Sequence, residues 1–303
     1  MEDPQLLEKN WKSQFIQLKE VKLHYISAGK GEPVILLHGF PEFWYAWKHQ
    51  IPELARHFHV IVPDLRGYNL SDKPTGKENY SLQKLATDIK ELIEKLGYPE
   101  AAIIGHDWGA LIGWTMALLY PKVVKKLGVI SVLHPHLLAR DYNSSLRVRL
   151  AWWHLRTLQI PWLPEVFISA FHFSLLHLVF SFYAGRREKT KPYLAAIKKS
   201  FSQQGALTSA INYYRQNVNS KMSGFERFDN DKVQCPVYFI YGKKDPIWPR
   251  TNINSLPETA ELIDSTFEFV EFPEAGHWVM HEEPELTTKH LLKFLKPKTN
   301  TGI

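Results

Sequence analysis

One aspartate in this sequence occupies a position where a nucleophile would be displayed. Asp107 lies in the stretch AAIIGHDWGAL at residues 101–111, where a short apolar run meets a glycine-rich turn and then a helix-like segment. Gly105 and Gly109 stand two residues before and after it, and a tight strand-to-helix turn requires such small residues because a side chain would collide across the bend. The spacing also fits an ordinary surface turn, so the interpretation depends on partners for Asp107 elsewhere in the chain.

The chemistry of a displayed carboxylate differs from that of a displayed serine. Attack on an ester carbonyl would give an anhydride, which is uphill, whereas attack on an electrophilic sp3 carbon gives an ordinary ester. Water must then cleave this enzyme ester, which requires a general base, a group that orients the base, and donors for the tetrahedral oxyanion. The pattern therefore predicts a substrate that carries an sp3 electrophile.

Two later residues can supply the base and its orienting group. Asp245 and His277 each follow an expected strand, and the chain order nucleophile, acid, histidine is one that catalytic triads use. His277 would take a proton from water, and Asp245 would fix its tautomer and stabilise the imidazolium. The backbone N–H groups of Phe40 and Trp108 are the expected oxyanion donors.

Strands and helices alternate around these residues as in a parallel α/β sheet. Apolar and alternating runs predict strands at residues 15–18, 21–27, 34–38, 59–63, 127–132, 237–242 and 267–272, in addition to the run that leads into Asp107. Helices are expected at residues 44–57, 82–96 and 284–295, the second with Ser81 as its N-cap. The predicted fold class is α/β, with an eight-stranded, mostly parallel sheet whose carboxyl ends carry the site.

The alternation of strands and helices stops between residues 133 and 228. This stretch is dense in Trp, Tyr, Phe, His and Leu and is punctuated by prolines. It predicts a helical cap that covers the site. We therefore expect a first part of the core at residues 1–132, the cap at 133–228, and a second part of the core at 229–303.

One segment of the cap is long and apolar. Residues 166–183 carry no formal charge, so their length and polarity also fit a transmembrane helix. His172 and His177 within the segment, and Glu165 just before it, favour a buried lid helix instead.

Composition narrows the class of protein. A chain of 303 residues with 45% hydrophobic residues suffices for one large domain with an insertion. The single cysteine, Cys235, and a first segment without the pattern of a secretory signal predict a cytoplasmic protein. The net charge of +6 comes from scattered Lys and Arg, which argues against nucleic acid and is compatible with weak peripheral contact with anionic membranes. We expect no metal and no cofactor, and the sequence fits both a monomer and a homodimer.

Six motifs together show a family resemblance. They are HGFPEFWYAW, DLRGYNLSDKP, GHDWGA, QIPWLPE, NYYR and GHWVMHEEP. From about residue 21 to the closing helix the chain resembles the epoxide hydrolases of the α/β-hydrolase fold, strongly in the core and more weakly in the cap. The resemblance implies an Asp nucleophile, a covalent hydroxyalkyl ester, and hydrolysis of that ester to a vicinal diol, with a small apolar epoxide and water as substrates.

The resemblance also implies which cap residues act on the substrate. In that family two cap tyrosines hold and protonate the epoxide oxygen, and the second of them matches Tyr214. At the position expected for the first tyrosine, counting back from QIPWLPE, this chain has His154. Trp153, Trp278 and the Phe40 side chain are the further substrate-binding residues that we expect.

Two other functions stay open at this stage. The related haloalkane dehalogenases use the same Asp nucleophile and a halide donor such as the indole of Trp108. They usually pair this indole with an Asn where this chain has Phe40, or with a lid Trp. Fluoroacetate dehalogenases carry arginines where it has Trp108 and Leu111, which disfavours small carboxylate substrates. The fold also occurs in ligand-binding homologues without catalysis, against which the complete triad argues.

Overall fold

The computed structural model describes residues 7–185, 193–218, 232–246 and 255–296. Eight helical side chains lie outside this description, namely those of Arg147, Ala151, Trp153, His154, Phe171, His172, Ser174 and His177. Among the described residues, no helix has the length and apolar character that crossing a membrane requires.

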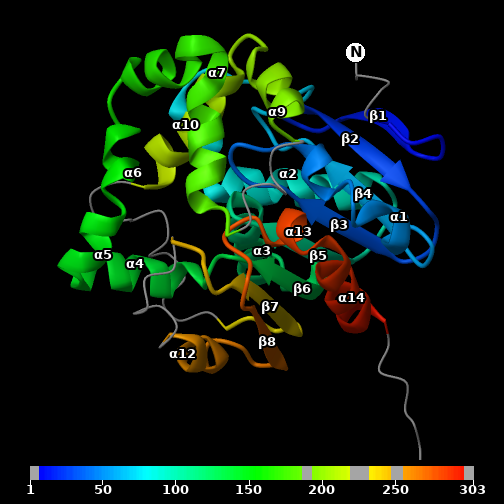
Figure 1. Ribbon diagram of the computed structural model, residues 1–303. Coiled ribbons are helices and arrows are strands. Elements are labelled where there is room, and N and C mark those ends of the chain that lie inside the picture. Colours follow the sequence, from blue (N-terminus) through cyan, green and yellow to red (C-terminus); the bar gives the residue numbers. More distant parts are fainter. Residues whose placement is uncertain (1–6, 186–192, 219–231, 247–254, 297–303) are drawn as a thin grey trace, which may run out of the picture.

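Eight strands form one sheet in the order β1-β2-β4-β3-β5-β6-β7-β8 (Figure 1). Their bounds are β1 Lys12–Gln17, β2 Lys22–Ala28, β3 Pro33–Leu37, β4 His59–Pro63, β5 Ala101–His106, β6 Val124–Ile130, β7 Val237–Gly242 and β8 Phe267–Phe272. The β1–β2 hairpin and the β2–β4 pair are antiparallel, and the other neighbours are parallel. The predicted eight-stranded, mostly parallel sheet is therefore confirmed.

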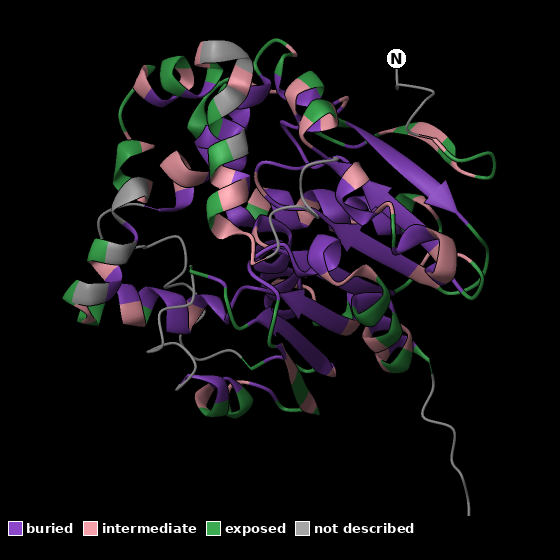
Figure 2. Ribbon diagram, in the orientation of Figure 1, coloured by how far each residue is buried: buried purple, intermediate pink, exposed green. Residues whose placement is uncertain are grey.

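Burial explains why the strands could be predicted from apolar runs in the sequence. Every residue of β5 and β7 is buried, as expected for strands covered on both faces, whereas the edge strands β1 and β8 expose part of their residues (Figure 2). The β5 and β7 strands are thus mostly apolar runs, whereas β1 and β8 contain polar and exposed residues.

Of the three core helices predicted with bounds, two agree with the structure to within one residue and one is an exception. The bounds are α2 Leu82–Lys95, α3 Trp108–Leu119 and α14 Pro284–Leu295, and two further helices, α12 Leu256–Glu261 and α13 Val279–Glu282, were not predicted. Ser81 caps α2, and its hydroxyl accepts a hydrogen bond from the Lys84 N–H at 3.4 Å. The α3 helix, which follows the nucleophile turn, packs on β3, β5 and β6.

The exception is the single helix predicted at residues 44–57, which was wrong. The segment forms a 3-10 turn at Trp44–Trp47 and a separate short helix, α1, at Ile51–Leu54. Pro52 lies in the first turn of α1, where its missing N–H is harmless. A longer helix through this proline would lose a hydrogen bond and crowd the carbonyl four residues earlier.

Among the described residues, six helices lie between β6 and β7, in the segment predicted as the cap. They are α4 Pro135–Ser144, α5 Leu146–Ala151, α6 Trp153–Thr157, α7 Leu163–Tyr183, α9 Leu194–Phe201 and α10 Ala206–Asn217. Figure 1 shows α5, α6, α7 and α10 gathered at one side of the sheet. The first predicted domain boundary, at 132/133, falls in the connection between β6 and α4, and the second, at 228/229, lies outside the described residues. The division into three segments stays a prediction.

The end of α7 is joined to the loop after β8. The His277 N–H donates to the Tyr183 carbonyl at 2.8 Å, and the Trp278 indole N–H donates to the Phe180 carbonyl at 3.1 Å. The rings of Phe180 and Trp278 stack with centroids 4.1 Å apart and planes at 10°. We call the two joined segments, residues 180–185 and 274–278, the cap junction.

Candidate active site

Asp107 stands at a sharp turn between β5 and α3. Its backbone has φ 52° and ψ −118°, a conformation that L-residues adopt only where the surroundings enforce it. A Cβ atom on Gly105 would overlap the Gly109 carbonyl, and one on Gly109 would overlap the Leu37 carbonyl. These close approaches are the physical reason for the glycines that the sequence shows on both sides of Asp107.

The two expected partners of Asp107 lie beside it. His277 Nε2 is 3.6 Å from Asp107 Oδ2, and His277 Nδ1 is 2.7 Å from Asp245 Oδ2. Asp245 and His277 are both 2% exposed, so the imidazole bridges two carboxylates away from bulk water. The geometry matches a nucleophile, a base and the group that orients the base.

The charges of these groups are strongly coupled. Burial opposes the charge of His277, but attraction to Asp245 and hydrogen bonds to Asp107 and Asp245 outweigh it and raise the pKa of His277 to about 10. Burial likewise opposes ionisation of Asp107, yet its hydrogen bond and attraction to His277 lower the pKa of that carboxyl. The resting site therefore holds an Asp107 carboxylate beside an imidazolium at neutral pH.

The two expected oxyanion donors flank the nucleophile. The Phe40 N–H donates to Asp107 Oδ1 at 2.9 Å, from a turn in which the Phe40–Pro41 peptide is cis. Trp108 is the first residue of α3, so its N–H belongs to the first helical turn, where such groups have no partner within the helix.

Tyr214, on α10, reaches the site from the cap. Its ring packs edge-on against Trp108 and Phe40, with centroids 5.0 and 5.6 Å apart. Burial and the nearby Asp107 carboxylate raise the pKa of the Tyr214 phenol well above 10, while a hydrogen bond from the Trp108 side chain acts in the opposite direction. Tyr214 is therefore a protonated phenol at neutral pH.

A second phenol, Tyr183, lines the same cavity and was not predicted from the sequence. Its ring centroid lies 6.1 Å from that of His277. Burial, Asp245 and Asp107 raise the pKa of Tyr183 to about 12. Tyr183 is the last residue of α7. In the sequence, only its hydroxyl at the end of this largely apolar segment indicated a role in the site.

Of the three remaining residues that we expected to bind substrate, the structure describes the side chain of one. Trp278 lines the cavity but is only 1% exposed and packs mainly on Phe180. The side chains of Trp153 and His154 lie outside the described part of the structure, so their roles stay predictions.

A buried polar cluster behind the triad was also missed. The Glu42 carboxylate contacts His106 Nδ1 at 3.2 Å and His281 Nε2, and His106 Nε2 donates to the His277 carbonyl at 3.0 Å. Burial opposes the charge of Glu42, but the two imidazoles hold its pKa below the usual value. The Ser131 hydroxyl donates to the same His277 carbonyl at 3.0 Å, so these hydrogen bonds hold the backbone of His277 in place.

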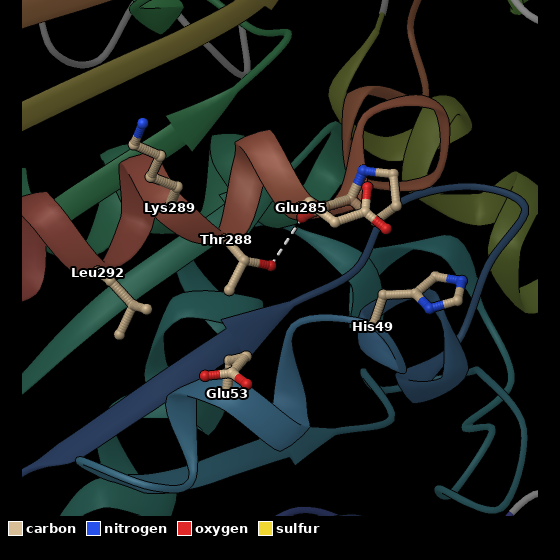
Figure 3. Close-up of a pocket in the computed structure, with 7 residues that line it drawn as sticks. His49, Glu53, Glu285, Thr288, Lys289 and Leu292 are labelled. Atoms are coloured by element: carbon tan, nitrogen blue, oxygen red, sulfur yellow. Dashed lines mark hydrogen bonds between the residues drawn. The ribbon is translucent and has the colours of Figure 1, made fainter.

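The triad opens into a large cavity of about 1180 Å³ between sheet and cap. Asp107 and His277 contribute to its wall, together with Phe40, Trp108, Tyr183 and Tyr214. A smaller cavity of about 340 Å³ lies between α1 and α14, where the Thr288 hydroxyl donates to the Pro284 carbonyl (Figure 3). Asp107, Asp245 and His277 do not line the smaller cavity, whereas Asp107 and His277 line the large one.

The described residues contain no group of three or more His, Cys, Asp or Glu side chains arranged to hold a metal ion.

Fold and site together define the class of this protein. Residues 32–284 match the alpha/beta hydrolase fold family, and the nucleophile position of that fold carries an aspartate here. The chain is 34% identical to human epoxide hydrolase 4, over 94% of this chain and 79% of the relative, and 36% identical to Caenorhabditis elegans epoxide hydrolase 1, over 97% and 72%. A crystal structure of Bacillus megaterium epoxide hydrolase in complex with an inhibitor superimposes with a TM-score of 0.84 at 33% identity, over 93% of this chain and 99% of that one. The chain belongs to the epoxide hydrolase family of α/β hydrolases, as the motifs predicted.

Proposed function

We propose that this protein hydrolyses epoxides to vicinal diols through a covalent ester on Asp107. The observation that carries the proposal is the contact of Asp107 with His277 in the wall of an apolar cavity, with two phenols beside it. The names of the similar proteins support the same substrate class.

The first step forms the ester. Asp107 is anionic at neutral pH because its pKa is lowered, and the Phe40 N–H orients the carboxylate through Oδ1. The carboxylate attacks one epoxide carbon, the bond from that carbon to the ring oxygen breaks, and the resulting alkoxide takes the proton of Tyr214. Tyr183 donates a second hydrogen bond to the same oxygen.

A proton transfer then prepares the base. Tyr214 is left as a phenolate, and the His277 imidazolium returns a proton to it. Esterification has by then removed the charge of Asp107, which helped to keep His277 protonated. The imidazole becomes neutral and can act as a base.

The second step cleaves the ester. His277 takes a proton from water, the hydroxide adds to the Asp107 ester carbonyl, and the Phe40 and Trp108 N–H groups stabilise the oxyanion. The diol leaves with the hydroxide proton, Asp107 is again a carboxylate, and His277 keeps the proton from water. Asp245 holds the ring through Nδ1 in both states.

Trapping the ester tests the proposal. We expect His277→Gln, incubated with styrene oxide, to gain the mass of one epoxide on the peptide that contains Asp107, because attack proceeds and hydrolysis does not. Asp107→Asn is the matched control and should gain no mass. An unmodified His277→Gln protein, with diol still produced, would mean that water attacks the epoxide directly.

Haloalkane dehalogenation is less well supported. The Trp108 ring packs edge-on against the phenol of Tyr214, which can protonate an epoxide oxygen, and Phe40 offers no side-chain donor for a halide. Measuring bromide release from 1-bromohexane by the same protein separates the two activities, and the ester-trapping experiment separates both from a non-catalytic ligand-binding role.

A further inference from the structure

A serine, a histidine and an aspartate are joined by hydrogen bonds at a place remote from the large cavity. Ser13 Oγ is 2.8 Å from His24 Nε2, and His24 Nδ1 is 2.6 Å from Asp64 Oδ2. His24 and Asp64 are both 0% exposed, whereas Ser13 is partly exposed. A hydroxyl, an imidazole and a buried carboxylate in this order are the arrangement that activates a serine nucleophile. We call Ser13, His24 and Asp64 the second triad.

Three adjacent strands hold the second triad in place. Ser13 lies on β1, His24 lies on β2, and Asp64 directly follows β4. The Asp64 N–H donates to the His24 carbonyl at 2.9 Å, which keeps the carboxylate beside the imidazole. The same carboxylate accepts hydrogen bonds from the Trp44 N–H at 3.0 Å and from the Asn69 side-chain amide at 2.8 Å, so its orientation is fixed.

The carboxylate of Asp64 decides which nitrogen of His24 carries the proton. An ionised carboxylate only accepts hydrogen bonds, so in the neutral imidazole the proton lies on Nδ1 and Nε2 has the lone pair. The Ser13 hydroxyl therefore donates to Nε2, and His24 can take this proton when Ser13 attacks an electrophile.

A second pair of serine and histidine in the chain lacks this carboxylate. Ser27 Oγ is 2.8 Å from His59 Nε2, but His59 Nδ1 contacts the Tyr98 hydroxyl at 2.6 Å. A phenol can donate as well as accept a hydrogen bond, so it does not fix the tautomer. Ser27 is also only 8% exposed. Ser27 is therefore a matched internal control for Ser13.

The backbone of Ser13 can stabilise an oxyanion. The Leu18 N–H donates to the Val21 carbonyl at 2.8 Å, and hydrogen-bonded pairs alternate with non-hydrogen-bonded pairs along an antiparallel ladder. By this alternation the pair of Ser13 and Ile26 is not hydrogen-bonded, so the Ser13 N–H points away from β2. Among the described strands β1 is the edge of the sheet on that side, so this N–H can donate to an oxyanion formed on Ser13.

Phe15 supplies an apolar surface on the same face of β1 as Ser13. Its ring is 50% exposed and lies with its centroid 5.1 Å from that of His24. The Lys22 ammonium lies 5.1 Å from the centroid of the same ring. A small ester with an aromatic leaving group can therefore pack on Phe15 while its carbonyl lies at Ser13.

The second triad is separate from the site of Asp107. Strands β2, β4 and β3 lie between β1 and β5, the strand that leads to Asp107, and four strand spacings correspond to about 19 Å. Figure 1 shows β1 and β2 on the side of the molecule opposite to α5 and α6. Neither Ser13 nor His24 lines the large cavity.

We propose that Ser13 is a second nucleophile of this protein and that it hydrolyses small activated esters independently of Asp107. Ser13 Oγ adds to the ester carbonyl while its proton passes to His24 Nε2, and the bond to the leaving oxygen breaks as that oxygen takes the proton. Water then adds to the acyl group on Ser13 and gives a proton to His24. The bond to Ser13 Oγ breaks, Ser13 regains its proton from His24, and the acid leaves.

Release of 4-nitrophenol from 4-nitrophenyl acetate at pH 8 tests the inference. We expect Ser13→Ala, made in the Asp107→Asn protein, to lower this release by at least about tenfold, because a positioned general base contributes about 10²- to 10⁴-fold. Ser27→Ala in the same protein is the matched control and should leave the release unchanged. Equal release with and without Ser13→Ala, at an unchanged melting temperature, would overturn the inference. Hydrolysis of styrene oxide by the Ser13→Ala single variant should equal that of wild type, so the two sites fail or succeed separately.

A fluorophosphonate identifies the nucleophile directly. Its phosphorus bonds to Ser13 Oγ, fluoride leaves, and His24 takes the proton, so the peptide that contains Ser13 should gain the phosphonyl mass in wild type and in Asp107→Asn. Labelling should also be slower in D2O than in H2O because the Ser13 proton moves during attack, and this comparison needs no variant of the buried His24. An unlabelled Ser13 peptide, equal labelling of the Ser27 peptide, or equal rates in the two solvents would each refute the inference.

Discussion

Replacing Asp107 by Asn should lower the pKa of His277, because the imidazolium loses one of its two carboxylate neighbours. His277 Nε2 lies 3.6 Å from Asp107 Oδ2, and the pKa of His277 is about 10. At that distance two unit charges attract by about 1 kcal/mol in water-like surroundings and by about 5 kcal/mol at an effective dielectric constant of about 20. Since one pH unit corresponds to about 1.4 kcal/mol, the pKa should fall by about one to three pH units.

Histidine labelled with ¹³C at Cε1 allows this titration to be followed by NMR. The protein has 14 histidines, so the His277 signal is assigned as the one that His277→Gln lacks. Asp264→Asn is the control, because Asp264 is exposed, pairs with Lys232 and contacts no group of the triad. A pKa that stays near 10 in Asp107→Asn would refute the reasoning, since esterification of Asp107 could then not release the base.

Three further predictions concern the acid, the pH dependence of stability and the nucleophile turn. Tyr214→Phe should slow ester formation by about 10²- to 10⁴-fold and Tyr183→Phe by about two- to tenfold, with ester hydrolysis nearly unchanged in stopped-flow traces; equal slowing of both steps would contradict the assignment. Because the pKa of His277 is raised, its contribution to the free energy of unfolding is complete below about pH 6.5 and is lost as the pH rises through about 10. In urea unfolding between pH 7 and 10, the wild-type protein should therefore lose more free energy of unfolding than His277→Gln. Similar losses of unfolding free energy in both proteins would contradict this contribution of His277. Gly109→Ala should destabilise the fold by about 2 kcal/mol or more because its Cβ overlaps the Leu37 carbonyl, and an unchanged melting temperature would show that the turn can relax.

The strands were predictable because central strands of a parallel sheet are buried on both faces. Their apolar runs stand out between Gly, Pro and Asp, and the bounds of β7, β8 and α14 coincide with those expected. The segment at 44–57 was harder, since its aromatic residues suit a helix while Pro52 restricts where one can begin. The restriction that Pro52 places on where a helix can begin would by itself have excluded a single helix over residues 44–57.

The proximity of Asp107, Asp245 and His277 was predictable for a different reason, namely that each of them follows a strand end in a fixed chain order. No comparable sequence pattern indicates that Tyr183 or Glu42 belongs to the site. Tyr183 reaches the cavity only because the end of α7 lies on the loop of His277, and Glu42 reaches His281 across 239 residues of sequence. Contacts of this kind depend on how the cap packs on the core, which no local pattern in one sequence encodes.

The cap junction restricts how caps can be exchanged between related enzymes. Gly185 and Gly276 touch backbone to backbone, and a Cβ on either would overlap the other segment. Phe180 and Trp278 form the stacked pair beside them. A chimaera that takes α7 from a relative must therefore take residues 274–278 from the same parent, or the end of the incoming helix will clash with the loop that carries His277. These few residues therefore prevent the cap from being exchanged between relatives independently of the core.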